Sequence, residues 1–487
     1  MTDAPIPAGF NTPIPAKIMT PDRVETRIGT LEFSDGFPTA ETAWLLYDHL
    51  DFVRGVEAFL SCIPAASLEA MRMGMTELGI TACQQVGIVD ELLDSNSLFL
   101  TGNTDTVYAS GILDLGRDGP TVVEIPPGCG PGTVNDAWFR FVIDMGRPGP
   151  DRGEGGKYLI VPAGYSDPIP DGYFVAESPS NINWLILRGL LVDGKPDTAR
   201  DSFRNGLRIY PLADAAAPPA TEFIPMSGKV FNTIHANDAE FYVELAAVIE
   251  REPLEVIDPE TRGLLAAIGI KKGTPFAPDS RMEAILADAA AVANGTARTI
   301  LFETRDPDAK LFADRAWKTG FVGGDYRWLI EDGLGGRNLD ARTLFFYAAT
   351  VNTPAMALKM PGLGSQYALV DHDGNGKHLD GSTNYQLTLP PDIPAKDFWS
   401  FVVYDPQTRS ELQTDQPFPS VNSQRDPLTA AEDGAITLTF GPDRPDDGSE
   451  NWIQTTAGKN WFGLLRLYGP LEPWFDRTWI PGDLEPT

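Results

Sequence analysis

The chain has 487 residues and a formal net charge of −30, from 68 acidic and 38 basic side chains. Its length favours about two to three domains, and so acidic a surface would repel phosphate backbones and anionic bilayers, which argues against nucleic-acid binding and membrane attachment. Three cysteines, Cys62, Cys83 and Cys129, are too few and too widely spaced for a disulfide framework or a CxxC metal site. We expect three buried free thiols, with a single bridge as the alternative.

The N-terminal segment is rich in proline and glycine, and we expect residues 1–38 to form an extended arm. It lacks the basic-then-apolar order of a signal peptide. No apolar run in the chain approaches the roughly 20 residues that a transmembrane helix needs. A cytoplasmic location is therefore expected, with a periplasmic one as the alternative if a leader has been removed.

A helix is predicted next, over residues 39–62. Leu45, His49 and Phe52 fall on one face at helical spacing. Pro64 should end this helix, because proline lacks the backbone donor that the next turn requires.

Short β-type runs alternate with turns from about Leu98 to Tyr210, for example AWFRFVIDM and KYLIVPAGY. Helical spacers between these runs are missing, which favours a β-sandwich or barrel over a βαβ arrangement. We place an N-terminal domain, made of the first helix and this β region, at residues 39–220.

A helical insert is predicted over residues 221–335. Asn237 precedes Glu240 by three residues, and Ser280 precedes Glu283 by three, which are two capping-box patterns. Each pattern predicts the start of a helix.

The β pattern returns towards the C-terminus, in runs such as YQLTLP, DFWSFVVYD and WFGLLRLYG. A C-terminal β-sandwich domain is therefore predicted over residues 336–487. The expected fold class is α+β and multidomain, with two β-sandwich-type, jelly-roll-like domains of different topology on either side of the helical insert.

Several long phrases carry a resemblance to a known family. They include NTDTVYASGILDL, AWFRFVIDMGRPGPDRGEGGKYLIVPAGY, FNTIHANDAEFY, ARTLFFYAATVNTPAMALKM and LRLYGPLEPWFD. In this order they resemble a bacterial family of paired uncharacterised domains, domain of unknown function 1254 followed by domain of unknown function 1214. The resemblance covers nearly the whole chain and implies two β-sandwich-type domains with a helical insert. It implies no settled chemistry, and its members often look secreted or periplasmic.

Some familiar catalytic and binding motifs are absent from the sequence, among them the GxSxG nucleophile elbow and the HExxH zinc motif. With only four histidines, a site built from several of them is hard to assemble. No cofactor is expected apart from a calcium ion considered below.

His235, in the phrase FNTIHANDAEFY, lies just before a predicted helix start. The positive end of a helix dipole keeps an imidazole neutral, so His235 beside Asp238 is a candidate general base. The alternative is a histidine that only hydrogen-bonds the backbone at the helix entrance.

Asn103, Asp105 and Tyr108 occur in the phrase NTDTVY. In a strand-like segment, Asn103 and Asp105 would point to one face and line a pocket, with Asp105 positioning substrate or water and Tyr108 binding substrate. The alternative is a turn in which both side chains cap backbone groups.

Trp138, Arg140 and Asp144 would share a strand face in AWFRFVIDM. Arg140 and Asp144 would lie about 13 Å apart along such a strand, too far for direct contact. They could still line one groove with Trp138 as its aromatic wall, with Arg140 stabilising developing negative charge. An outward polar face is an equal alternative.

The phrase DHDGNG resembles the start of a calcium loop, with oxygen ligands from Asp371, Asp373 and Asn375. Position twelve of the loop is Ser382, where a bidentate glutamate would be needed, so a hairpin turn is the preferred interpretation.

The C-terminal phrases contribute a last group of candidates for ligand binding. Arg466 and Tyr468 alternate on one predicted strand face and would present a cation and a phenol to a ligand. Asn451 and Trp452 are added to this substrate-binding set.

Three functions follow from these candidates. The preferred one is a hydrolase or lyase for a small, weakly polar organic molecule, with its pocket between the β layers and the helical insert. Its catalytic group would be His235, Asp238, Asp105 and Arg140. The alternatives are a non-catalytic protein that binds a small molecule or carbohydrate, and a structural component of an assembly. The expected partners are a small-molecule ligand and further copies of the chain, in a homo-oligomer.

Overall fold

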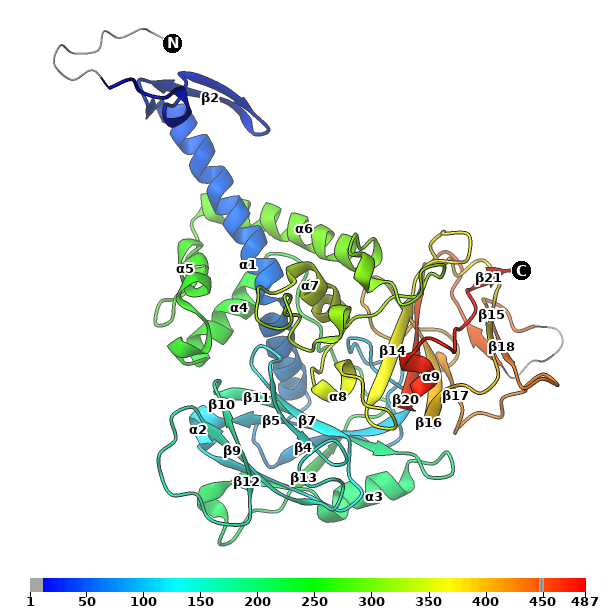
Figure 1. Ribbon diagram of the computed structural model, residues 1–487. Helices are drawn as coiled ribbons and strands as arrows, with labels where there is room; N and C mark the ends of the chain where they lie inside the picture. Colours follow the sequence, from blue (N-terminus) through cyan, green and yellow to red (C-terminus); the bar gives the residue numbers. More distant parts are fainter. Residues whose placement is uncertain (1–11, 446–447, 449–450) are drawn as a thin grey trace.

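The computed structural model describes residues 12–445, 448 and 451–487. A helical layer lies against the N-terminal sheets and beside the C-terminal sheets, and a small sheet projects from the rest together with the start of the first long helix (Figure 1). The chain is thus α+β and multidomain, as its sequence predicts. Within the described ranges, no helix combines the length and the apolar character that crossing a bilayer requires.

The N-terminal segment is not an extended arm over its described part. The short helix η1 (Ala16–Ile18) is followed by a three-stranded antiparallel sheet of order β1-β2-β3. These strands are β1 (Arg23–Thr26), β2 (Gly29–Ser34) and β3 (Phe37–Pro38). No residue of the three strands is fully buried, so the sheet has no core of its own.

Helix α1 (Ala40–Glu77) continues through Pro64, so the prediction that it ends there is wrong. Proline inside a helix costs about 3 kcal/mol. From Ala58 to Met75, however, most of its side chains are buried against other helices. That apolar burial outweighs the local cost.

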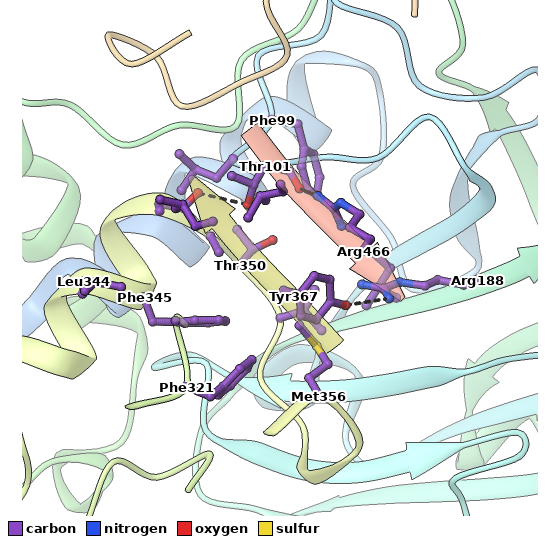
Figure 2. A pocket seen from close by; sticks show the side chains of 18 of the residues that line it. Phe99, Thr101, Arg188, Phe321, Leu344, Phe345, Thr350, Met356, Tyr367 and Arg466 are labelled. Carbon is purple, nitrogen blue, oxygen red and sulfur yellow. Dashed lines mark hydrogen bonds between the residues drawn. The ribbon is translucent and has the colours of Figure 1, made fainter. Parts of the chain in front are cut away.

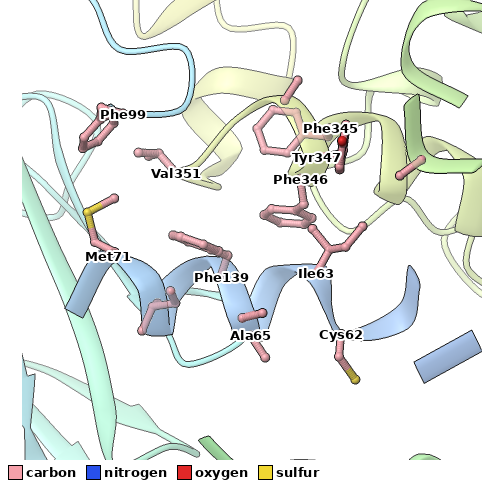
Figure 3. Close-up of a cluster of buried hydrophobic side chains, with 14 of the residues drawn as sticks. Cys62, Ile63, Ala65, Met71, Phe99, Phe139, Phe345, Phe346, Tyr347 and Val351 are labelled. Atoms are coloured by element: carbon pink, nitrogen blue, oxygen red, sulfur yellow. The ribbon is translucent and has the colours of Figure 1, made fainter. Parts of the chain in front are cut away.

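Four helices pack against α1 and share its hydrophobic core. They are α4 (Glu240–Arg251), α5 (Pro259–Ala267), α6 (Ser280–Phe302) and α7 (Leu339–Ala348). Figure 3 shows the part of this core where Ile63 of α1 lies near Phe346 of α7. The helical layer therefore also includes α1 and α7, which lie outside the predicted insert at 221–335.

Both predicted helix caps need correction. The side chain of Asp238, rather than Asn237, accepts a hydrogen bond from the Glu240 backbone at the start of α4. At α6 the cap is Asp279, which accepts from Met282, one residue before the predicted position. An aspartate at either place satisfies a free backbone donor as well as the predicted residue would.

The N-terminal β region consists of two sheets. Their orders are β13-β4-β5-β11-β7-β8 and β10-β9-β6-β12. Val107, Val123, Leu185 and Ile209 belong to the hydrophobic core between them. The elements are β4 (Gln85–Val89), β5 (Thr106–Asp114), α2 (Leu115–Asp118), β6 (Thr121–Ile125), β7 (Gly132–Asp136), β8 (Phe141–Met145), β9 (Gly156–Pro162), β10 (Phe174–Ser178), β11 (Ile182–Leu190), α3 (Asp197–Gly206), β12 (Arg208–Pro211), η2 (Leu212–Asp214) and β13 (Glu222–Pro225).

The C-terminal β region also has two sheets, of order β14-β20-β16-β17 and β19-β18-β15-β21. They share a core that includes Leu387, Phe401, Leu438 and Leu465. The strands are β14 (Ser365–Val370), β15 (Tyr385–Leu389), β16 (Ala395–Tyr404), β17 (Ser420–Asn422), β18 (Ile436–Gly441), β19 (Trp452–Gln454), β20 (Phe462–Pro470) and β21 (Glu485–Pro486). The remaining short helices are η3 (Leu254–Val256), η4 (Pro307–Ala309), η5 (Val322–Gly324), α8 (Pro354–Ala357) and α9 (Glu472–Phe475).

The three cysteines are buried and free, as predicted. Burial raises the pKa of each thiol to about 12. They are therefore unreactive packing residues rather than nucleophiles.

Candidate functional site

A hollow lies where the N-terminal sheet, the segment from α7 to β14 and strand β20 meet (Figure 2). We call it the interdomain pocket. It contains about 710 Å³ of space that protein atoms do not fill, and this volume includes open solvent. Most of its wall is apolar. The apolar side chains include Phe99, Ile186, Phe321, Leu344, Phe345, Val351, Met356, Leu369 and Leu464.

The polar end of the interdomain pocket is built from two tyrosine–arginine pairs. Tyr108 on β5 and Arg188 on β11 are opposite each other in the N-terminal sheet. Tyr367 on β14 and Arg466 on β20 are opposite each other in the C-terminal sheet. In each pair the guanidinium lies over the partner ring, with its carbon 6.0 Å from the Tyr108 centroid and 5.4 Å from the Tyr367 centroid. Each sheet thus supplies one cation and one phenol.

The two pairs meet across the junction of the sheets, and Figure 2 shows Arg188 beside Tyr367 there. Arg188 Nη1 donates to Tyr367 Oη at 3.4 Å, and the hydroxyls of Ser365 and Tyr367 hydrogen-bond at 2.5 Å. Burial alone would raise the pKa of Tyr367, but the charges of Arg188 and Arg466 more than offset it and bring that pKa below its ordinary value. Tyr367 is therefore easier to ionise than a free tyrosine.

Neither arginine of the pocket has a carboxylate partner among the described residues. Arg188 is 8% exposed and Arg466 is 3% exposed, and no acid lies within ion-pairing distance of either in the part of the chain that the structure describes. Arg466 Nη2 donates to the Thr101 carbonyl, and its Nε has no partner among the residues that the structure describes. A buried cation normally has a counterion in contact. The buried Glu411 carboxylate interacts electrostatically with Arg466, so the pocket lacks a direct ion pair rather than all negative charge.

Asp105 joins the two β regions through hydrogen bonds next to the pocket. It accepts hydrogen bonds from Ser400 at 2.5 Å, Asn422 at 3.1 Å and Tyr468 at 3.1 Å. These three donors belong to the sheet of β16, β17 and β20, the Thr104 hydroxyl donates to it at 3.5 Å, and its own exposure is 0%. Asp105 therefore holds the wall that carries Arg466, and its carboxylate has no face left for substrate or water.

Asn103 has a local role in the turn before β5. Its side-chain oxygen accepts from the backbone of Asp105 and from both the backbone and the hydroxyl of Thr106. Because β5 begins only at Thr106, the prediction of a shared strand face for Asn103 and Asp105 is wrong. Asn103 matches the turn alternative, whereas Asp105 does not.

Asp144, on β8, borders a second, smaller hollow that shares Arg188 and Met356 with the interdomain pocket. The Thr353 hydroxyl lies 2.7 and 2.8 Å from its two carboxylate oxygens. Burial raises the pKa of Asp144 to about 6, despite these hydrogen bonds. It is a polar group close to the pocket but not part of its wall.

Trp138 and Arg140 lie in a different place, in the turn that precedes β8, so the predicted strand face shared with Asp144 is wrong. They line a large cleft of about 1760 Å³, open to solvent, with Arg327, Arg337 and Arg342 among its other residues. Arg140 is neutralised there by Asp136, at 2.5 Å. This pairing distinguishes it from the unpaired arginines of the interdomain pocket.

His235 is buried in the helical layer and lines neither the interdomain pocket nor the large cleft near Arg140. Its ring packs against Phe59, Phe241 and Tyr347. Its Nδ1 donates to the Ala236 carbonyl at 2.8 Å, which leaves Nε2 as an acceptor with no partner among the described residues. Burial and the nearby charge of Arg409 lower its pKa to about 3.

The structure does not assemble the predicted catalytic group. The Asp238 carboxylate accepts a hydrogen bond from the Glu240 backbone at the start of α4, rather than orienting the His235 ring. Asp105 is bonded into the C-terminal sheet, and Arg140 lines the other cleft. His235, Asp105 and Arg140 therefore do not face a common cavity.

Of the C-terminal candidates, only some lie at or beside the interdomain pocket. Arg466 lines the interdomain pocket and Tyr468 supports it through Asp105. The Asn451 side chain instead joins the Thr429 and Thr437 carbonyls, and the Trp452 indole donates to a carbonyl beside β19. Asn451 and Trp452 therefore stabilise the sheet that contains β18 and β19, and neither lines the pocket.

The predicted calcium ligands do not converge. Asp373 accepts from the backbones of Asn375 and Lys377, both at 2.9 Å, which is the hairpin-turn alternative. Asp371 pairs with Lys318 and with His372. These contacts leave no ring of oxygen atoms for Ca²⁺.

Two pocket residues, Arg188 and Tyr367, were not predicted from the sequence. Arg188 stands in WLILRGLL, where it is the single charge in an otherwise apolar strand. A charge inside a buried run is a signal of a functional or paired residue. Tyr367 carries no comparable signal, because tyrosine is ordinary in a strand.

Comparison with known proteins shows that the pocket lies between two domains of known family models. Residues 83–211 match the family described as Protein of unknown function (DUF1254), and residues 364–472 match Protein of unknown function (DUF1214). The chain belongs to the family that pairs these two domains. Tyr108 and Arg188 lie in the DUF1254 domain, while Tyr367 and Arg466 lie in the DUF1214 domain. Each domain of this DUF1254–DUF1214 protein therefore contributes one tyrosine–arginine pair.

A solved structure shows a similar overall fold. The VPA0106 protein from Vibrio parahaemolyticus aligns with a TM-score of 0.54 and 16% identity, over 90% of this chain and 100% of that one. A putative uncharacterized protein from Burkholderia cenocepacia aligns with a TM-score of 0.40 and 12% identity, over 92% and 97% of the two chains. No curated protein matches the chain in sequence.

Proposed function

We propose that this DUF1254–DUF1214 protein binds a small organic anion in the interdomain pocket. The observation that carries the proposal is the pair of buried guanidinium groups, Arg188 and Arg466, which have no acidic partner among the described residues. An anionic ligand would supply the missing counterion. Because one arginine comes from each domain, the ligand would also hold the two domains together.

The chemistry of the walls favours a monocarboxylate with an apolar or aromatic body. Guanidinium groups offer planar pairs of donors that match a carboxylate. Phe321, Phe345 and Met356 would cover an apolar body and exclude water from it. A free phosphate or a sugar would leave these apolar walls unused, so they favour a carboxylate over the carbohydrate expected as one alternative.

Calorimetric titration with benzoate, phenylacetate and octanoate tests the proposal, with benzamide as the uncharged match of benzoate. We expect saturable binding of at least one carboxylate and none of benzamide. Arg188→Gln should weaken binding about tenfold or more, because each charge-assisted hydrogen bond contributes about 1.5–3 kcal/mol. Arg140→Gln is the matched control. Equal binding of benzoate and benzamide would refute the anion site.

A second candidate function is catalysis, as a hydrolase or lyase acting on the bound anion. The lowered pKa of Tyr367 supports it, since a phenol that ionises readily can exchange a proton with a substrate. Tyr367 faces the pocket, whereas His235 does not. Tyr367 therefore takes the place of His235 as the proposed acid–base group.

Tyr367→Phe separates the two functions. If the protein is an enzyme, this variant should keep its affinity for the carboxylate and lose turnover of whichever substrate a screen of esters and hydroxy acids identifies. If the protein only binds, no member of the screen is converted by the wild type, and the variant shows at most a small change in affinity.

We further propose a jelly-roll-like topology for each β region and a homo-oligomeric assembly. Jelly-roll-like topology is supported by the packing of two sheets over a common core in each β region. A homo-oligomer is supported by exposed aromatic side chains on the projecting N-terminal elements, namely Phe37, Trp44 and Tyr47.

A further inference from the structure

We propose that Glu303, His372 and His378 form a binding site for a first-row divalent transition cation such as Zn²⁺. Glu303 is the residue that follows the last turn of α6. His372 and His378 lie opposite each other in the connection between β14 and β15, with ring centroids 4.2 Å apart. Two of the four histidines of the chain thus meet one carboxylate at the junction of the helical layer and the C-terminal β region.

The spacing of the three ligand atoms fits one small ion. Glu303 Oε1 lies 3.0 Å from His378 Nε2 and 3.6 Å from His372 Nε2, and all three atoms lie within 4.8 Å of one another. Ligands bound tetrahedrally to Zn²⁺ at about 2.0–2.2 Å are separated by about 3.3–3.6 Å. Small side-chain adjustments would therefore complete the coordination.

A second layer of contacts fixes the orientation of His372. Asp371 Oδ1 lies 2.8 Å from His372 Nδ1, so the proton is held on Nδ1 and Nε2 is left for a metal. The same Asp371 pairs with Lys318 at 2.5 Å, and Lys318 also donates to the Leu301 and Phe302 carbonyls at the end of α6. A carboxylate that orients a ligating imidazole in this way is a regular feature of metal sites.

The donor set selects the type of cation. Two imidazoles and one carboxylate suit Zn²⁺, Co²⁺ and other first-row ions, whereas Ca²⁺ and Mg²⁺ prefer oxygen ligands throughout. Glu303 and His372 border an open hollow of about 890 Å³. A water molecule or a small anion would therefore have room to occupy the fourth position of the ion.

The position of the site indicates what the ion would do for the protein. It would link the end of α6 to the β14–β15 connection, which the Lys318–Asp371 pair already bridges. Binding to the folded state alone raises stability, by an amount that grows with the logarithm of the free ion concentration once it exceeds the Kd. The melting temperature should therefore rise when Zn²⁺ is added.

The test uses the full, untagged chain after dialysis against a chelator, titrated with ZnCl₂ in a calorimeter. We expect one ion per chain in the wild type, and affinity lowered about tenfold or more in His378→Ala, His372→Ala and Glu303→Gln. His49→Ala, which removes an exposed histidine on α1, is the matched control and should bind like the wild type. Mg²⁺ at the same concentration should not compete.

The ordinary alternative is that the two imidazoles only pair with Glu303 as cations. Low pH would then strengthen the contact, whereas metal binding is lost as the histidines become protonated. Saturable Zn²⁺ binding that disappears below about pH 5.5 and in His378→Ala supports the proposal. An absence of binding, or binding that is unchanged in His378→Ala, overturns it. Circular dichroism of each variant shows whether the fold is retained.

Discussion

Arg188 and Tyr367 belong to different family domains, and 3.4 Å separates the Arg188 Nη1 from the Tyr367 hydroxyl. This distance is at the long end for a hydrogen bond, so the contact satisfies the guanidinium only weakly. Tyr108 and Arg466, the other members of the two tyrosine–arginine pairs, complete the same polar end. The junction of the two domains therefore contains a hollow whose polar end presents two guanidinium groups, neither in contact with an acid of the described residues.

Asp105→Ala should weaken the attachment of the two domains. The substitution leaves three buried donors, on Ser400, Asn422 and Tyr468, without an acceptor. Losing a buried charged partner costs about 3–5 kcal/mol. Scanning calorimetry should show a lower melting temperature or a separate early transition. The exposed Asp171→Ala is the control and should change stability by less than about 0.5 kcal/mol. Wild-type melting of Asp105→Ala would mean that water replaces its carboxylate.

His235→Ala should lower stability. The side chain is 2% exposed and contacts three aromatic rings, so its removal leaves a cavity in the helical layer. Comparable deletions cost about 2–5 kcal/mol. Urea unfolding followed by far-UV circular dichroism measures the effect, with His49→Ala as the exposed match. A variant that unfolds like the wild type but loses activity would restore the general-base role expected from the sequence.

The sequence predicted the coarse fold because its signals are local or family-wide. Alternating apolar runs indicated both β regions, and capping residues indicated helices near 240 and 280. The length of α1 could not be predicted in this way. The local rule ends a helix at Pro64, whereas burial against helices that are distant in the sequence decides the outcome.

The candidate site was predicted only in part, for a related reason. Tyr108 and Arg466 were assigned to substrate binding, and both line the interdomain pocket. Arg188 completes the site only because β11 pairs with β5 in a register that places it opposite Tyr108. Strand register and domain docking depend on contacts between residues distant in the sequence. The sequence alone therefore could not rank Arg188 above His235 as a site residue.

The projecting N-terminal elements should mediate self-association. Phe37, Trp44 and Tyr47 are 78%, 63% and 59% exposed, and solvent-exposed aromatic groups on a projecting sheet and helix are typical of interfaces. Light scattering coupled to size-exclusion chromatography should give a mass above that of one chain. Phe37→Asp combined with Tyr47→Asp should reduce it to the monomer mass. Val230→Asp, at an 80% exposed position elsewhere, is the control. An oligomer that survives the double substitution would exclude these side chains as its interface.

Asp144→Asn should stabilise the protein at neutral pH. Burial raises the pKa of Asp144 from its ordinary value to about 6. The folded state therefore keeps this proton while the unfolded chain has released it, so ionisation removes stability as the pH rises from about 4 to about 6. An asparagine is never ionised and avoids this loss. Each unit of pKa shift corresponds to about 1.4 kcal/mol, so the gain should approach about 2–3 kcal/mol above pH 6.

The dependence on pH identifies Asp144 as the source of the gain. The difference in unfolding free energy between Asp144→Asn and the wild type should be near zero below about pH 4, rise to about pH 6 and then stay constant. Thr353, whose hydroxyl hydrogen-bonds the carboxylate, can still donate to the amide oxygen of the variant. A difference that is independent of pH would show that the effect comes from packing, and that the Asp144 carboxyl is not held protonated in the folded protein.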